Sequence, residues 1–290
     1  MALLMMTMNV GAQTKRALVI GLGQQQDKEW NKINGDKDVV YVKRMLHDAG
    51  FRNIKTLVNQ QATKVGIVDA FKNITEKCQQ GDIVYIHYSG HGQQMRDVHN
   101  DEADGLDECW IPFDAYQKSS KTYHGEKHLT DDEINYHLNR IRDKVGEKGK
   151  ILVVVDACHC GDSTRGKDND SIVVRGIEDI FEPITALIAG VTKRVKKEHS
   201  SIKPHEERWI TISACQSYQV NYEMKAPAVG KLTYALYNII KEHCNDNNGA
   251  LMQRMRRLFK SPKYRTKASQ TPIMTGDDQY KYNVTEILHK

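Results

Sequence analysis

Apolar residues along the chain recur at two spacings, one typical of strands and one typical of helices. Short continuous apolar runs rich in Val, Ile and Tyr predict buried strands. The predicted strands cover residues 16–23, 51–59, 82–90, 150–158, 208–215 and 271–276. Between them, apolar residues three and four positions apart predict amphipathic helices. The predicted helices cover residues 38–50, 63–81, 130–145, 231–243 and 250–260.

This alternation of strands and helices predicts the fold class. Strands that are apolar on both faces indicate a mainly parallel sheet covered by helices on each side, which is a three-layer α/β/α architecture. The sequence contains no repeat and no low-complexity linker, so we expect residues 15–290 to form a single domain. In such a sheet, functional groups collect just beyond the carboxyl ends of the strands.

Composition narrows the class of protein further. The chain has 290 residues, of which 39% are hydrophobic and 27% charged, as in ordinary globular proteins. Its net charge of +5 is spread along the sequence. Because no basic run is interleaved with aromatic residues, we do not expect nucleic acid as a partner. No apolar run reaches the roughly 20 residues that a membrane-spanning helix needs.

The N-terminal residues 1–14 allow two interpretations. Residues 2–10 are mostly apolar and residues 10–12 are small, which is the pattern of a secretory signal peptide cut after Ala12. No Lys or Arg precedes the apolar run, so a disordered tail on a cytoplasmic protein is the alternative. The pattern favours a secreted or periplasmic protein.

Two of the predicted strands end in loops that carry reactive side chains. "HYSGHGQQ" covers residues 87–94, and "DACHCGD" covers residues 156–162. A catalytic thiol needs a base to form its thiolate, and imidazole suits this role near neutral pH. If the two strands are neighbours, His91 meets Cys158 at the edge of the sheet. The backbone N–H groups of Gly92 and Cys158 would then suit an oxyanion hole.

Other uses of the cysteine loop are less well supported by its spacing. His159 is adjacent to Cys158 and points away from it on an extended chain, although a pair of His159 and Cys160 stays an alternative. Cys158 and Cys160 are too close for a comfortable disulfide, and no second ligand pair at a familiar spacing suggests a metal site. We expect the six cysteines of the chain to be mainly buried thiols.

The two loops together resemble those of the caspase-fold cysteine peptidases, and the metacaspase-like branch most of all. That branch has a Ser-Gly-His-Gly loop and an Asp-Ser-Cys-His-Ser-Gly loop, in which Ala157 and Cys160 here replace the two serines. The resemblance covers residues 15–280 and includes these further segments: "DEADGLDECWIPFD" (101–114), "LTDDEI" (129–134), "ISACQSYQ" (212–219), "LTYAL" (232–236) and "QTPIM". It implies an endopeptidase in which Cys158 attacks the peptide carbonyl and His91 protonates the leaving amine. The resemblance therefore implies that the substrates are proteins or peptides and that the reaction requires no cofactor. The alternative is an inactive interaction module on the same fold.

The resemblance also implies which substrate side chain is held. Metacaspase relatives cut after Arg or Lys and bind the cation with carboxylates, so we expect partners with basic residues. Asp156 matches one carboxylate, Ser89 would line the same pocket, and Asp38 is expected to be the second acid, with Asp36 in reserve. The alternative for Asp38 is an N-cap of the following helix. The oligomeric state is not predicted.

Acidic residues gather in residues 100–108 and at the start of the next helix. The resemblance implies calcium binding there, and the candidates are Asp104, Asp107, Asp131 and Asp132. The alternative is an exposed acidic loop beside a helix N-terminus that favours negative charge.

The polar residues 162–183 follow the cysteine loop and contain basic residues in chain that we expect to be exposed. Arg165 and Arg175 precede glycines, and Lys167 lies close by. A peptidase that prefers basic residues would cut itself after Arg165, Lys167 or Arg175. The alternative is a plain surface loop.

Overall fold

The centre of the molecule is a six-stranded sheet. The computed structural model describes residues 13–97, 105–158, 173–177, 179–183, 207–242, 245–264, 266 and 269–290. The strand order is β11-β8-β7-β3-β1-β2, and every neighbouring pair is parallel except β11 with β8. The strands are β1 (Lys15–Gly21), β2 (Asn53–Val58), β3 (Ile83–Ser89), β7 (Lys150–Asp156), β8 (Ile210–Ser213) and β11 (Ile273–Thr275). The α/β fold class expected from the hydrophobic pattern is confirmed.

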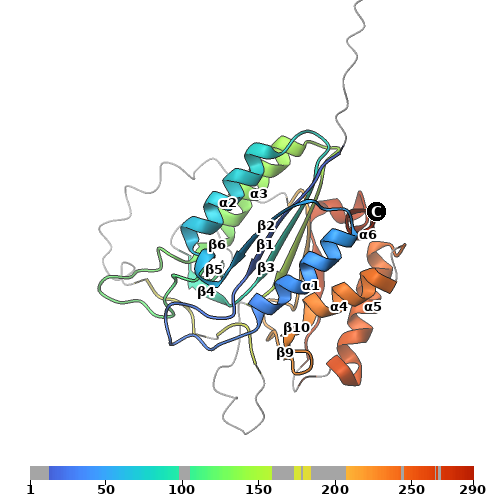
Figure 1. The fold of residues 1–290 in the computed structure, drawn as a ribbon. Helices are drawn as coiled ribbons and strands as arrows, with labels where there is room; N and C mark the ends of the chain where they lie inside the picture. The colour runs from blue at the N-terminus through green and yellow to red at the C-terminus, as the bar shows by residue number, and fades with distance from the viewer. Residues whose placement is uncertain are drawn as a thin grey trace, which may run out of the picture.

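Helices cover both faces of this sheet, as Figure 1 shows. The helices are α1 (Gly35–Asp48), α2 (Lys64–Lys77), α3 (Asp131–Val145), α4 (Lys231–Glu242), α5 (Asn248–Lys260) and α6 (Val284–Leu288). The short 3₁₀ helices are η1 (Asn59–Gln61), η5 (Pro262–Tyr264) and η6 (Asp277–Tyr280). Helices α2 and α3 pack on one face, and α1, α4, α5 and α6 pack on the other. Within the described residues, no helix is long and apolar enough to cross a membrane.

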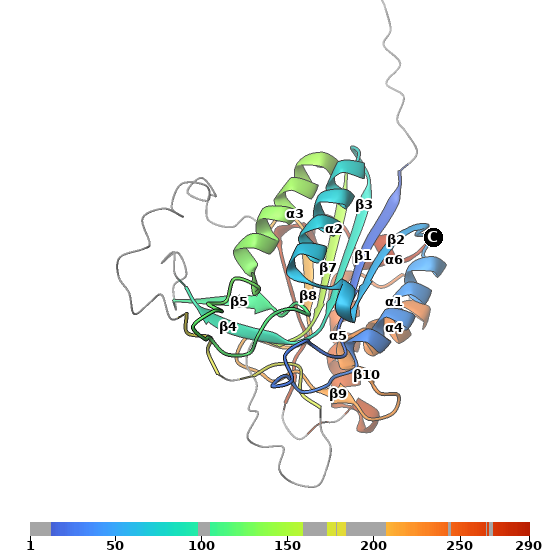
Figure 2. The same cartoon turned by 60° about the vertical axis from the view of Figure 1, so that its left-hand side comes forward.

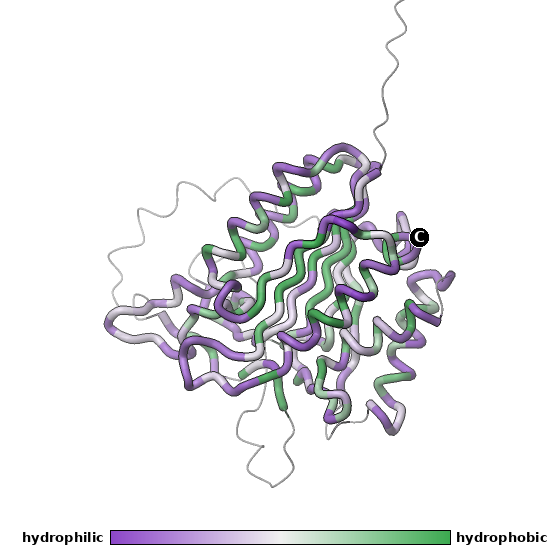
Figure 3. Tube along the Cα trace, viewed as in Figure 1, coloured by the Kyte–Doolittle hydropathy of each residue, from purple (hydrophilic) through white to green (hydrophobic). Residues whose placement is uncertain are grey.

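Alternating side chains of the central strands supply the two halves of the core. All residues of β3 are buried; Ile83 and Tyr85 belong to the cluster with α1 and α4, whereas Val84 and Ile86 belong to the cluster with α2 and α3. Side chains two positions apart share a face, so Ser89 faces the α1 and α4 side. Figure 3 shows the apolar strands at the centre and polar residues on the outer turns of the helices.

Smaller elements lie beyond the carboxyl ends of the central strands, where β3 and β7 finish (Figure 2). A three-stranded sheet contains β4 (Gly92–Arg96), β5 (Leu106–Trp110) and β6 (Leu129–Thr130). A second pair contains β9 (Glu223–Met224) and β10 (Val229–Gly230). The hydrophobic pattern missed these strands because β6, β9 and β10 have only two residues each and because β4 and β5 contain many polar residues.

Two local expectations were wrong. The acidic segment 100–108 was expected to be a loop, but Leu106 to Glu108 belong to β5, and Asp107 is buried. The first helix was expected at Asp38, but it begins at Gly35, where a Cβ atom would collide with the carbonyl oxygens of Leu22 and Ser89. This glycine lets the helix start directly against the ends of the strands.

Candidate active site

The ends of β3 and β7 form one wall of a buried polar pocket. Ser89 and Asp156 are the last residues of these strands and are register partners. Asp38, from the first turn of α1, accepts hydrogen bonds from the Ser89 hydroxyl and, at 2.8 Å, from the Gly230 amide. All three side chains are fully buried. The structure thus brings together Asp38, Ser89 and Asp156.

The alternatives for the first acid can be separated by position. Asp36 is partly exposed, and its carboxylate accepts a long hydrogen bond of 3.4 Å from Asn59. The N-cap position of α1 is occupied by Asn34, so the interpretation of Asp38 as a helix cap is wrong. The carboxylate that lies in the pocket is therefore that of Asp38.

The side chain of Arg175 fills this pocket. Its Nη1 atom donates to Asp38 Oδ2 at 2.7 Å, to Ser89 Oγ at 2.6 Å and to the main-chain oxygen of Asp156 at 3.0 Å. It also lies 3.4 Å from Asp156 Oδ1. Arg175 has no exposed surface. The expectation that this residue lies in exposed chain was wrong.

A third carboxylate, which sequence reasoning missed, completes the contacts of the guanidinium. Glu223, in β9, accepts a hydrogen bond from Arg175 Nε at 2.9 Å and is itself held by the backbone N–H of Asn34 at 2.6 Å. Three acidic groups around one cation offset the cost of removing a guanidinium from water. No periodic pattern marks Glu223, because it lies in a short strand of only two residues.

Two further residues hold the carboxylate of Asp156. Asn221 Nδ2 donates to Oδ1 at 2.8 Å, and the Thr233 amide and hydroxyl donate to Oδ2 at 2.8 and 2.7 Å. Thr233 lies in the first turn of α4, so the start of this helix fixes the acid. Sequence reasoning noticed the α4 segment but assigned no role to Asn221 or Thr233.

The two strand-end acids respond differently to burial. Burial raises the pKa of Asp38 to about 6, although the Arg175 cation lowers it; the nearby Asp156 charge raises it further. Burial also opposes ionisation of Asp156, but the Arg175 cation and the hydrogen bonds from Asn221 and Thr233 outweigh it and lower its pKa. Asp156 therefore stays ionised more readily than Asp38, and Asp38 takes up a proton first as the pH falls.

The backbone of Arg175 lies against the two predicted oxyanion donors. Its carbonyl oxygen accepts hydrogen bonds from Cys158 N–H at 2.9 Å and from Gly92 N–H at 3.4 Å. Gly176 follows directly, and a Cβ atom placed on it would lie 2.8 Å from Cys158 Sγ. The peptide bond between Arg175 and Gly176 thus lies beside the thiol, and the histidine and cysteine loops meet at one carbonyl.

Residues on the amino side of this bond adopt an extended conformation. The Arg175 amide donates to the Asn221 carbonyl, and the Glu223 amide donates to the Val173 carbonyl, each at 3.0 Å. Val174 and Tyr222 form the antiparallel bridge between them. These bonds are made by main-chain groups, so any extended peptide can make them.

The imidazole of His91 is held by the loop after β1. Its Nε2 atom lies 2.8 Å from the carbonyl oxygen of Asn31, and its ring centroid lies 5.0 Å from that of Trp30. A carbonyl can only accept, so Nε2 carries the proton and Nδ1 is the basic nitrogen of the neutral ring. Within the described residues, Nδ1 is buried and has no hydrogen-bond partner.

Burial controls the charge of this histidine. Burial lowers the pKa of His91 to about 4; the bond to Asn31 raises it and the Arg175 cation lowers it. At neutral pH the ring is therefore uncharged and able to accept a proton.

Three of the four calcium candidates lie in the described part of the chain: Asp107 in β5, and Asp131 and Asp132 at the start of α3. Cys109 of β5 pairs with Thr130 of β6, which places Asp107 near the start of α3, where Asp131 and Asp132 lie. No three carboxylate, imidazole or thiol groups come together to hold a metal ion in the part of the chain that the structure describes. Because Asp104 lies outside the described residues, calcium binding stays a prediction.

Several predicted residues lie outside the described part of the chain: His159, Cys160, Asp104, Arg165, Lys167 and residues 1–12. The cysteines that are described are all buried, namely Cys78, Cys109, Cys158 and Cys215.

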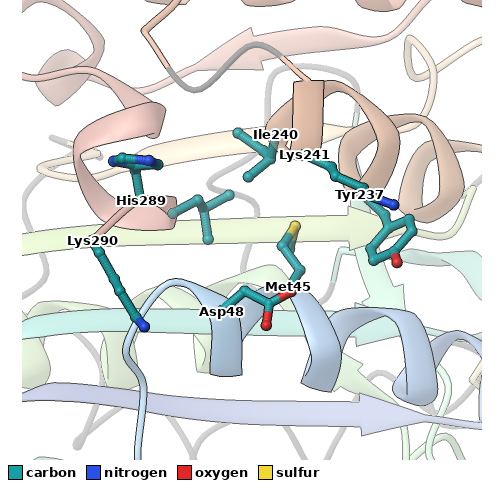
Figure 4. A pocket seen from close by; sticks show the side chains of 8 residues that line it. Met45, Asp48, Tyr237, Ile240, Lys241, His289 and Lys290 are labelled. Atoms are coloured by element: carbon teal, nitrogen blue, oxygen red, sulfur yellow. The ribbon is translucent and has the colours of Figure 1, made fainter.

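A separate pocket lies at the opposite end of the sheet (Figure 4). There Lys15, at the start of β1, donates to the carbonyls of Ala49 and His289 at 2.8 and 2.7 Å. The pocket is lined by Met45, Asp48, Tyr237, Ile240, Lys241, Leu288, His289 and Lys290. None of these is a predicted site residue.

Fold and loop order together define the class of protein. A mainly parallel sheet between two helical layers, with a histidine loop and a cysteine loop at its carboxyl edge, is the architecture of caspase-like α/β proteins. The chain belongs to the caspase domain family, whose model matches residues 14–283. The resemblance to this family is thereby confirmed.

Similar proteins include metacaspases of eukaryotic microbes. Metacaspase-1 of Schizosaccharomyces pombe is 24% identical over 94% of this chain and 70% of its own length. Metacaspase-1 of Plasmodium falciparum is 26% identical over 80% of this chain but only 35% of its own length, so the chain spans about a third of that relative.

Solved structures share the fold. A protein of Geobacter sulfurreducens superposes with a TM-score of 0.63 and 23% identity, over 90% of this chain and 92% of the other. Caspase-1 of Spodoptera frugiperda gives a TM-score of 0.57 and 12% identity, over 91% and 86%.

Proposed function

We propose that the protein is a cysteine endopeptidase that cleaves peptide bonds after Arg or Lys, with Cys158 as nucleophile and His91 as base. The observation that carries this proposal is the position of Arg175. Its guanidinium is buried against three carboxylates while its carbonyl oxygen accepts hydrogen bonds from the Gly92 and Cys158 amides. A substrate must make both sets of contacts for its carbonyl to be attacked.

The chemistry follows the positions of these groups. His91 Nδ1 takes the thiol proton, and the Cys158 thiolate attacks the carbonyl carbon. The developing oxyanion accepts hydrogen bonds from the Gly92 and Cys158 N–H groups. His91 then protonates the leaving amine, which leaves a thioester on Cys158. Water that gives a proton to His91 hydrolyses the thioester and restores the thiol.

The preference for a basic residue follows from charge. A pocket with three carboxylates binds a cation and repels an acidic side chain. Arg engages both ends of the pocket, because Nη1 contacts Asp38 and Ser89 while Nε contacts Glu223. A lysine ammonium is a single point charge and cannot reach both ends at once. We therefore expect Arg to be preferred to Lys.

We also propose that the chain cleaves itself between Arg175 and Gly176. The neighbouring candidates Arg165 and Lys167 are not described, whereas the Arg175 carbonyl already accepts the two amide hydrogen bonds. Until this bond is cut or the segment leaves, Arg175 blocks the pocket, so the uncleaved chain would be a zymogen.

Mass spectrometry of the purified protein tests both proposals. The wild type is expected to yield one fragment that ends at Arg175 and one that begins at Gly176. Cys158→Ala, His91→Ala and Arg175→Gln should each stay intact at this bond, whereas the matched control Cys78→Ala should be cut. A cut between these residues in Cys158→Ala would rule out self-cleavage.

A panel of fluorogenic peptides that differ only in the residue before the cut tests the preference. We expect cleavage after Arg, less after Lys and none after Asp. Assays with added calcium and with a chelator decide whether calcium activates the enzyme. If no peptide is cut and Cys158 resists alkylation under either condition, the chain is instead an inactive interaction module on this fold.

A further inference from the structure

The segment that follows Gly176 lies along β4. Gly176 forms a parallel bridge with Gly92, and Phe181 forms one with Met95. The Phe181 amide donates to the Gln94 carbonyl at 2.8 Å, and the Arg96 amide donates to the Phe181 carbonyl at 3.1 Å. The segment is thus an added strand on the edge of the small sheet, held by bonds that do not depend on its side chains.

One side chain of this segment enters a closed apolar pocket. Phe181 is 2% exposed, and its ring centroid lies 4.4 Å from that of His128 and 5.8 Å from that of Tyr123. The apolar residues clustered around it are Trp30, Met95, Cys109, Ile111, Ala115, Tyr123 and Ile177. The neighbouring Ile180, in contrast, is 39% exposed. At this end of the segment the aromatic ring is therefore the buried apolar contact, and the exposed Glu182 pairs with Arg96 of β4 at 2.7 Å.

The floor of the pocket is shaped for a flat ring. Gly125 lies so close that a Cβ atom there would be 2.8 Å from Phe181 Cε1 and 3.0 Å from Met95 Sδ. Any larger residue at position 125 would displace the ring. The positive φ of 94° at Gly125 also favours glycine.

A chain of polar contacts anchors the backbone just before the ring. Gln93 Nε2 donates to the Asp179 carbonyl at 2.9 Å, and Gln93 Oε1 lies 2.9 Å from His128 Nε2. His128 Nδ1 in turn lies 2.8 Å from the hydroxyl of Tyr123. Because these partners are buried, Gln93 is held with its amide toward the bound peptide.

We propose that β4 and the Phe181 pocket form a second substrate-docking site, which selects an aromatic residue six positions after the cleaved bond. The inference rests on the proposed function, because Phe181 is the sixth residue after Arg175 only if cleavage occurs there. The resident segment occupies the site in this chain. Peptides that present Arg at the cut and Phe six residues later compete for it.

Cleavage of three internally quenched peptides tests the selection. The first has the sequence of residues 173–182; the second and third carry Phe181→Ala and Ile180→Ala. The enzyme is the self-processed Phe181→Ala variant, whose own pocket is empty. Loss of the ring should lower kcat/KM at least about tenfold, since burial of a phenyl side chain is lost. The Ile180→Ala peptide should stay within about twofold of the first. Equal kcat/KM for all three peptides would overturn the proposal.

A second measurement does not need cleavage and so separates this inference from the proposed function. In the Cys158→Ala protein, amide hydrogen exchange of residues 176–183 reports whether the segment is docked. Phe181→Ala should speed this exchange at least about tenfold, whereas Ile180→Ala should leave it unchanged. Exchange that is equally fast in all three proteins would overturn the docking site, even if the enzyme cuts after Arg.

Discussion

The strongest test of the pocket is to remove the Arg175 cation without removing the pocket. Under the proposal, the Cys158→Ala protein cannot cleave itself. In this background, Arg175→Gln keeps the chain intact and keeps the main-chain hydrogen bonds of residue 175. The substitution leaves three carboxylates without their counter-ion. In the parent chain the Arg175 guanidinium lies 2.7 Å from Asp38, 3.4 Å from Asp156 and 2.9 Å from Glu223. All of these groups are buried.

The size of the effect follows from this burial. Removing one partner of a buried ion pair costs about 3–5 kcal/mol. Water that enters the emptied pocket reduces the loss, so we expect the free energy of unfolding to fall by about 3 kcal/mol. For a chain of this size that lowers the Tm by roughly 6–12 °C. The exposed Arg140→Gln is the matched control and should cost less than about 1 kcal/mol.

The stability lost in Arg175→Gln should depend on pH, and the Asp38 carboxyl sets the direction of this dependence. The pKa of Asp38 is already raised to about 6 with Arg175 present, and it rises further once the cation is gone. A carboxyl whose folded pKa exceeds its unfolded value weakens the fold as pH rises between the two. Two further titratable groups face this pocket: burial lowers the pKa of His87 to about 4 and that of Lys231 to about 8, while the Asp156 charge raises both. The stability gap between variant and parent should therefore widen from pH 5 to pH 8.

A small cation should restore what Arg175 supplied. Agmatine, which carries the same guanidinium, is expected to raise the Tm of the Arg175→Gln protein. At ten times its Kd it adds about 1.4 kcal/mol to the free energy of unfolding. The parent should gain nothing, because its pocket is filled; butylamine should act more weakly. The reasoning is refuted if Arg175→Gln leaves the Tm unchanged, or if agmatine stabilises both proteins equally.

Three further changes test the surroundings of the pocket. Glu223→Gln should lower kcat/KM for Arg peptides roughly tenfold and for Lys peptides much less, because Arg Nε loses a charged acceptor; an unchanged Arg-to-Lys ratio would contradict this role. Burial lowers the pKa of His87 to about 4. The free energy of unfolding should therefore fall by about 2 kcal/mol from pH 7 to pH 5, because His87 takes up a proton in the unfolded chain but not in the folded one. Urea denaturation of His87→Gln should show a shallower loss of stability as pH falls, and the exposed His47→Gln should not. Gly230→Ala would place a Cβ 2.5 Å from Asp38 Oδ2 and 2.6 Å from Arg175 Nη1, so self-cleavage on a gel should slow at least tenfold, unlike in Gly249→Ala.

The parts of the molecule that sequence could predict are those governed by periodicity. Strands β3 and β7 are apolar along most of their length because both faces are covered, and such runs are easily recognised. The chemistry at their ends could also be located, since carboxyl ends of parallel strands share one edge. The positions of Ser89 and Asp156 at the ends of two predicted strands are enough to predict that both lie at this edge, and their register confirms it.

The missed features depend on groups far apart in the chain. No sequence pattern around Glu223 indicates a role for it. Its role is apparent only from its contacts with Arg175 and Asn34 in the structure. Arg175 itself was expected outside because residues 162–183 are polar and loop-like, and arginine is almost never buried unless it is paired. Its three partners come from residues 38, 156 and 223, so no local window of sequence contains the reason for its burial.

Under the proposed self-cleavage, the same contacts set how strongly the uncleaved chain is inhibited. Arg175 is tethered to the nucleophile by the intervening residues, so its effective concentration at the pocket exceeds that of most free substrates. Cutting after Arg175 leaves the guanidinium on the fragment that carries Cys158, but it turns the carbonyl into a carboxylate. The thiol restored on Cys158 carries no charge, and the Gly92 and Cys158 amides can still donate to the new carboxylate. Under the proposed self-cleavage, the pocket is therefore opened only when Gly176 is released and Arg175 dissociates, and the remaining hold on Arg175 is what a basic substrate must exceed.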